Sequence, residues 1–123
     1  MVDNRPQADR ILVVRLSGAA GRLSRWGALD DAQADAAAAE LREMAGGRAD
    51  LLAEVAGIRL GTAESKSPEY VAQAEAIARL CRAAGAEAQA ISEWAEEGRR
   101  RAAAARRPPA GGGVRGGGAR PAL

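Results

Sequence analysis

The chain has 123 residues, the size of one domain, and it contains no histidine, one cysteine and 32 alanines. Without histidine it lacks the usual general base at neutral pH, and a single cysteine cannot build a Cys-rich zinc site, an intramolecular disulfide or a Cys-His nucleophile. Residues 1–97 carry eleven basic and 16 acidic side chains, a net −5, whereas residues 98–123 carry seven arginines and no acid. We therefore expect no enzyme, no cofactor, no metal site, and a basic C-terminal end.

The first predicted helix begins near Pro6, because proline is tolerated in an opening turn. Its apolar stripe repeats at spacings of three and four residues and consists of Leu12, Leu16, Ala19, Leu23 and Trp26. A strand over residues 11–14 is the alternative, but no second β-branched run is present to pair with it. Gly18 and Gly21 weaken this helix, and they either allow close helix contact or mark a break.

Two further helices are expected in the next part of the chain. Asp30 or Asp31 can cap the second helix, and Gly46–Gly47 ends it. Asp50 is the expected cap of a third, shorter helix, which presents Leu51, Leu52, Val55 and Ile58. Two glycines bracket the expected end of that helix, Gly57 and Gly61.

The clearest helix start in the sequence is Ser67–Glu69, with a serine cap, a proline in the first turn and an acid favoured by the helix dipole. Gly85 ends this fourth helix. A fifth helix begins near Ala86, carries Ile91, Trp94 and Ala95 inward, and runs through the arginines that precede Pro108–Pro109.

These elements predict an all-α fold, a small helical bundle of about four to five helices over residues 1–107, with a disordered Gly/Arg-rich C-terminal tail over residues 108–123. The core is thin, because alanine supplies most of the apolar residues and buries little area. A homo-oligomer or a protein partner is therefore expected. No apolar run approaches the roughly 20 residues of a membrane span, and the N-terminus lacks a secretory pattern, so we expect a cytoplasmic protein.

One candidate site is a helix-turn-helix-like pair around Gly85. Such DNA-binding units have a small residue four positions before the turn glycine and apolar residues six and nine positions after it, and this chain has Cys81, Ile91 and Trp94 there. The face that would enter the DNA groove carries three acids and a glutamine, Glu87, Gln89, Glu93 and Glu96. Acids repel phosphates, so an ordinary helical hairpin closed by a glycine is the simpler interpretation.

The second candidate site is the arginine cluster at the C-terminal end, a candidate polyanion-binding segment. Its members are Arg99, Arg100, Arg101, Arg106, Arg107, Arg115 and Arg120. A cationic helix end followed by a Gly/Arg segment free of acids suits phosphate groups, and the lack of aromatic residues predicts sequence-tolerant, electrostatic binding to nucleic acid. The structural alternative is that these arginines complement the helix dipole and form i,i+4 pairs, Glu96 with Arg100 and Glu97 with Arg101.

Residues 50–109 carry a resemblance of low specificity. The segments are Leu51-Leu-Ala-Glu-Val-Ala-Gly, Cys81-Arg-Ala-Ala-Gly and Trp94-Ala-Glu-Glu-Gly-Arg-Arg-Arg, followed by Pro108–Pro109. In these segments the chain resembles small uncharacterised all-helical proteins of high-GC actinomycetes, some of which sit among mobile-element genes. The resemblance implies a helical fold and no catalytic residues.

The sequence thus favours a non-enzymatic helical protein-interaction module that self-associates and whose Arg/Gly tail engages a polyanion or an acidic surface. The alternative is a small DNA-binding accessory or regulatory protein that uses the helices around Gly85.

Overall fold

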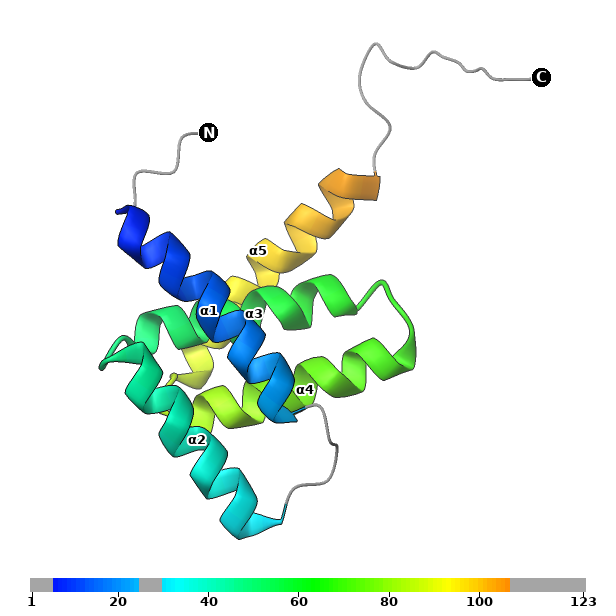
Figure 1. Ribbon diagram of the computed structural model, residues 1–123. Coiled ribbons are helices and arrows are strands. Elements are labelled where there is room, and N and C mark those ends of the chain that lie inside the picture. Colours follow the sequence, from blue (N-terminus) through cyan, green and yellow to red (C-terminus); the bar gives the residue numbers. More distant parts are fainter. Residues whose placement is uncertain (1–5, 25–29, 107–123) are drawn as a thin grey trace, which may run out of the picture.

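The computed structural model describes residues 6–24 and 30–106, and within these residues it contains five helices and no strand. The helices are α1 (Gln7–Ser24), α2 (Asp31–Ala45), α3 (Ala49–Ala63), α4 (Pro68–Ala83) and α5 (Ala88–Arg106) (Figure 1). The predicted all-α bundle is confirmed, and residues 11–14 lie within the predicted first helix and not in the alternative strand. Trp26, the last member of the expected α1 stripe, and the predicted tail over 108–123 lie outside the described residues.

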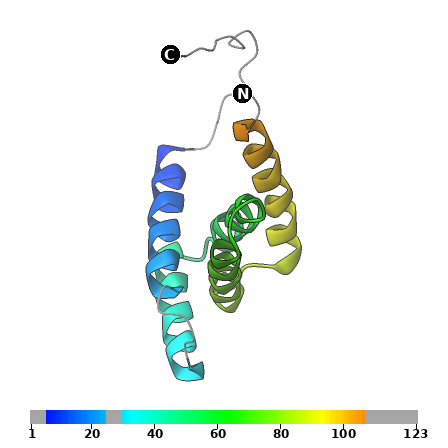
Figure 2. The same ribbon diagram turned by 90° about the vertical axis from the view of Figure 1, so that its right-hand side faces the viewer.

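The helices are arranged in three layers (Figure 2). Helices α1 and α2 form one outer layer, α3 and α4 form the middle layer, and α5 covers the other side. The most extensive helix contact joins α3 to α5, while α1 and α2 both pack on α3 and α4. Helix α3 is therefore covered on both sides, which explains why it is the most deeply buried helix of the described chain.

The core is built largely from alanine. Among the described residues, 22 apolar side chains are buried, and 13 of these are alanines. The largest fully buried side chains are Leu16, Leu41, Leu52, Ile77 and Cys81. Small side chains let the helix backbones approach closely, so the expected thin core is realised as close helix packing.

The expected roles of the glycines in α1 and α3 are wrong. Helix α1 runs unbroken through Gly18 and Gly21, and a Cβ atom at either position would meet nothing within 4 Å. Helix α3 continues past Gly57 and Gly61 to Ala63 instead of ending between them. Gly57 and Gly61 lie where α3 contacts α5, and a Cβ atom at either position would overlap the α5 backbone. These glycines therefore allow the two helices to pack closely and do not end α3.

The start of α3 also differs from the expectation. Asp50 lies in the first turn of α3 instead of capping it, and Arg48 occupies the N-cap position. The Arg48 guanidinium donates to Asp50 Oδ1 and Oδ2 at 3.1 and 2.9 Å and to Asp9 Oδ1 and Oδ2 at 2.9 and 3.0 Å. This bidentate pairing ties the start of α1 to the corner between α2 and α3.

The corner between α4 and α5 forms as the sequence predicts. Gly85 follows α4 with a φ of +125°, a backbone conformation that side chains rarely adopt, and the Ala86 N–H donates to the Cys81 carbonyl at 2.9 Å. Arg42 of α2 strengthens this corner by donating to the carbonyls of Ala83 and Ala84 at 3.0 and 3.3 Å. The end of α4 is thus held by a side chain from another layer.

Candidate polyanion-binding surface

The described arginines of the candidate segment lie on the C-terminal half of α5. Gly98 is the last buried residue of this helix, and a Cβ atom there would lie 2.7 Å from the Ile58 carbonyl oxygen of α3. The C-terminal end of α5, orange in Figure 1, projects past the other helices. Arg99, Arg100, Arg101 and Arg106 are all exposed on this projecting end, which we call the α5 basic end.

Three of these four arginines pair with carboxylates. Arg99 donates to Glu64 Oε2 at 2.8 Å, and Glu64 follows α3 at the start of the loop that leads to α4. Arg100 and Arg101 share Glu97, with closest contacts of 2.7 and 2.9 Å. The predicted i,i+4 pair of Glu97 with Arg101 is confirmed, whereas Arg100 pairs with Glu97 and not with Glu96, because a residue three positions earlier is also within reach on a helix. The two guanidinium groups lower the pKa of the Glu97 carboxyl.

The structure divides the basic end into two sides. Arg99 and Arg106 are seven residues apart, so they share one face of α5, and both line a shallow cleft of about 270 Å³ beside Gly61 and Glu64. Arg101 lines a different cleft between α1, α3 and α5. The remaining members of the segment, Arg107, Arg115 and Arg120, lie outside the described residues. The described basic end thus has four guanidinium groups, and three of them pair with only two carboxylates. An excess of positive charge remains.

The helix-turn-helix-like residues lie together on the inside of the α4–α5 corner. Cys81 and Ile91 are buried in the core, and Trp94 packs against it. Their burial is what any helical hairpin requires. The exposed side of α5 near this corner carries Glu87, Gln89, Glu93 and Glu96, and Gln89 donates to Glu93 Oε2 at 3.2 Å. This acidic face is poorly suited to a phosphate backbone.

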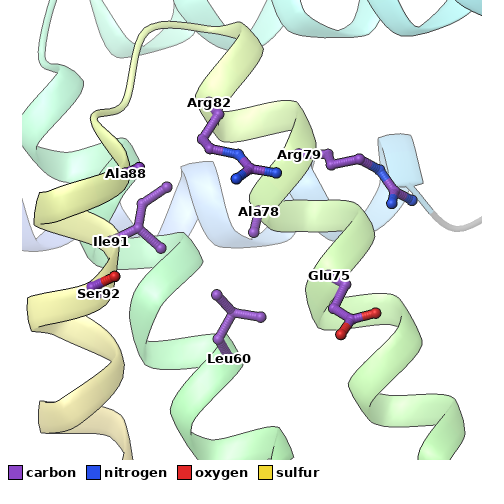
Figure 3. Close-up of a pocket in the computed structure, with 8 residues that line it drawn as sticks. All are labelled: Leu60, Glu75, Ala78, Arg79, Arg82, Ala88, Ile91 and Ser92. Carbon is purple, nitrogen blue, oxygen red and sulfur yellow. The ribbon is translucent and has the colours of Figure 1, made fainter.

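Sequence reasoning did not single out a cleft of about 420 Å³ between α3, α4 and α5. Figure 3 shows Leu60 of α3 and Ile91 of α5 facing this space, with Glu75, Arg79 and Arg82 along the α4 side. Neither of these two arginines takes part in an ion pair among the described residues. Their spacing of three residues on one face of a helix was the available signal, but only the fold places Leu60 and Ile91 beside them.

Two kinds of site find no support in the described chain. Within residues 6–24 and 30–106, no three or more His, Cys, Asp or Glu side chains are grouped so that they could hold a metal ion. Cys81 is fully buried, and burial raises the pKa of its thiol to about 11, so the reactive thiolate is scarce at neutral pH. None of the helices described here has the length and apolarity to cross a membrane.

Comparisons of this chain with protein-family models, with curated proteins and with solved structures gave no match. The resemblance of residues 50–109 to helical actinomycete proteins accordingly stays a prediction.

Proposed function

We propose that this protein is a non-enzymatic, self-associating helical interaction module whose Arg/Gly-rich C-terminal end engages a polyanion or an acidic protein surface. The observation that carries the proposal is the projecting, exposed α5 basic end (Figure 1). Its four arginines exceed the two carboxylates that contact them, and after residue 106 the sequence adds three arginines and no acid. All of this charge lies at one end of the chain.

The ion pairs at the basic end do not prevent anion binding. The Arg99–Glu64 pair is exposed on both sides, with side chains 46% and 53% accessible, and the arginines that pair with the half-buried Glu97 are exposed. Such pairs contribute little because water and salt screen them. A phosphate-rich ligand can replace the carboxylates with bidentate contacts to arginine. No aromatic residue lies within 98–123, so binding is electrostatic and tolerant of sequence.

The test measures binding of the full chain to a labelled DNA duplex by fluorescence anisotropy over a range of salt concentrations. We expect affinity to fall steeply with salt, with a slope in log K against log salt of about −0.9 for each phosphate neutralised. One variant changes the arginines of the basic end to glutamine, and a second changes those of the tail. They are Arg99, Arg100, Arg101 and Arg106 in the first, and Arg107, Arg115 and Arg120 in the second.

Each variant should bind more weakly and with a shallower salt slope than the wild type. The matched control changes Arg79 and Arg82 to glutamine, two exposed arginines of α4, and it should retain the wild-type slope. Absence of binding by the full chain at low salt would overturn the polyanion proposal and leave an acidic protein surface as the partner. Binding that survives both variants and prefers one duplex would favour the alternative function, DNA recognition by the helices around Gly85.

We also propose a cytoplasmic location. It is supported by Cys81, which is a free, buried thiol, because reduced cysteines are typical of cytosolic proteins.

A further inference from the structure

The outer layer of the molecule presents two exposed helix faces on the same side. Helices α1 and α2 both bury one face against α3 and α4, so their opposite faces point away from the bundle together (Figure 2). The two helices run side by side in opposite directions (Figure 1). We call the two exposed faces together the α1–α2 surface.

The α1 part of this surface is apolar in its centre and basic at its edges. Ile11 and Val14 are 49% and 71% exposed, which is unusual for large aliphatic side chains in a chain that has so few of them. Gly18 follows on the same face one turn later, where a Cβ atom would meet nothing. Exposed arginines flank the stripe on both sides, Arg10, Arg15 and Arg22.

The α2 part of the surface carries small residues and acids. The exposed alanines along it are Ala32, Ala36 and Ala39, at spacings of four and three residues. The exposed acids are Asp35 and Glu40 beside the alanines, and Glu43, which continues their line four residues after Ala39. Among the described residues, no ion pair engages these acids or the flanking arginines of α1.

The two helix faces are complementary to each other and not to themselves. Packing α1 on a second α1 would bring arginines together, and packing α2 on a second α2 would bring carboxylates together, both of which are unfavourable. Packing α1 on α2 instead brings the exposed arginines of α1 against the exposed acids of α2. The small alanine side chains allow the helix backbones to approach closely.

We propose that the α1–α2 surface binds a second copy of this chain, with α1 of each copy lying on α2 of the other. A two-fold axis that runs between α1 and α2, parallel to them, produces this arrangement and forms the same contact twice. Because α1 and α2 run in opposite directions, the paired helices from the two copies are antiparallel. A second copy is the occupant that the charges favour, since one surface carries both the basic and the acidic half of the match.

This inference rests on the self-associating part of the proposed function and is independent of polyanion binding. The test measures the molar mass of the full chain by sedimentation equilibrium, with circular dichroism to confirm that each variant is folded. One variant reverses the α1 charges with Arg15→Glu and Arg22→Glu. Another reverses the α2 charges with Glu40→Arg and Glu43→Arg. All four side chains are exposed, so the bundle tolerates the changes.

We expect the wild type to be a dimer and each variant alone to show a dimer dissociation constant raised at least about tenfold, equivalent to about 1.4 kcal/mol. Mixing the two variants should restore a dimer, because reversed α1 then faces reversed α2 at one contact and the unchanged α1 faces the unchanged α2 at the other. The matched control, Arg79→Glu with Arg82→Glu on α4, makes the same change in net charge and should remain a dimer.

The outcomes distinguish failure of the α1–α2 surface from failure of the proposed self-association. A monomeric wild type overturns both self-association and this surface. A dimer that both charge-reversal variants retain leaves self-association intact and overturns the α1–α2 surface. Dissociation of the α4 control, or failure of the mixed variants to associate, also overturns the proposed pairing of α1 with α2.

Discussion

Gly61 of α3 and Gly98 of α5 lie against each other where the two helices cross, and a Cβ atom on Gly98 would be 3.1 Å from the Gly61 Cα. At Gly61 an added Cβ atom would overlap the Ala95 carbonyl oxygen and lie 2.7 Å from the Arg99 backbone nitrogen. Backbone cannot yield as a flexible side chain does. The absence of side chains at these positions therefore sets how closely α5 docks, and it fixes where the basic end leaves the bundle.

Gly61→Ala should lower the free energy of unfolding by about 2 kcal/mol, since the strain of overpacking exceeds the gain in helix propensity. Gly21→Ala in α1 is the matched control, because a Cβ atom there meets nothing. It should raise stability by about 0.5–1 kcal/mol. Urea denaturation followed by circular dichroism measures both, and a Gly61→Ala protein as stable as the wild type would contradict the close backbone contact.

The N-termini of α2 and α4 should respond differently to loss of the N-cap side chain. Asp30 Oδ1 accepts from the Gln33 N–H at 2.7 Å, and Gln33 Oε1 accepts from the Asp30 N–H at 3.0 Å, a complete capping box. Ser67 occupies the N-cap of α4 but makes no capping hydrogen bond through its side chain. Asp30→Ala should cost about 1 kcal/mol of stability, whereas Ser67→Ala should stay within about 0.5 kcal/mol of the wild type. Equal losses in chemical denaturation would contradict this order.

Acid should remove the contribution that the ion pairs of Arg48 with Asp9 and Asp50 make to the stability of the fold. The Arg48 guanidinium lowers the pKa of the Asp50 carboxyl below its ordinary value of 3.8. A carboxyl whose pKa is lower in the folded state adds stability above pH 3.8, and that stability is lost as the pH falls through the folded-state pKa. Arg48→Met should therefore lower the melting temperature at neutral pH, and its difference from the wild type should shrink below pH 3.8.

The control for this experiment is Arg79→Met, because Arg79 is exposed and takes part in no ion pair among the described residues. Its melting temperature should follow that of the wild type at every pH. A difference between Arg48→Met and the wild type that does not change with pH would show that the ion pairs contribute nothing.

Cys81 should be protected from thiol reagents in the folded protein. Its side chain is fully buried, and burial raises the pKa of the thiol from 9.0 to about 11. Labelling with a disulfide reagent near pH 8 should be slow and should proceed at the rate of unfolding, whereas the protein in denaturant should react at once. The same shift makes stability fall between pH 9 and pH 11, where only the unfolded thiol loses its proton. Rapid labelling under native conditions would contradict the buried position.

The sequence by itself determined the all-α class and most helix starts and stops. The apolar stripe of α1, the paired glycines after α2 and the proline that opens α4 are local signals, and local backbone preference is enough to interpret them. Ser67 shows the limit of such signals, since the sequence identifies the capping position but not whether the side chain makes the hydrogen bond.

Only the tertiary structure decided what the glycines and charges do. Gly21 and Gly61 look alike within helical sequences, yet one faces open space and the other meets the backbone of α5, because the partner comes from a distant part of the chain. Likewise Arg99 reaches Glu64, 35 residues earlier, a pairing that no helical spacing predicts. The opposite charges of α1 and α2 gain meaning only when both helices lie in one layer, since periodicity identifies an exposed face but not its neighbours.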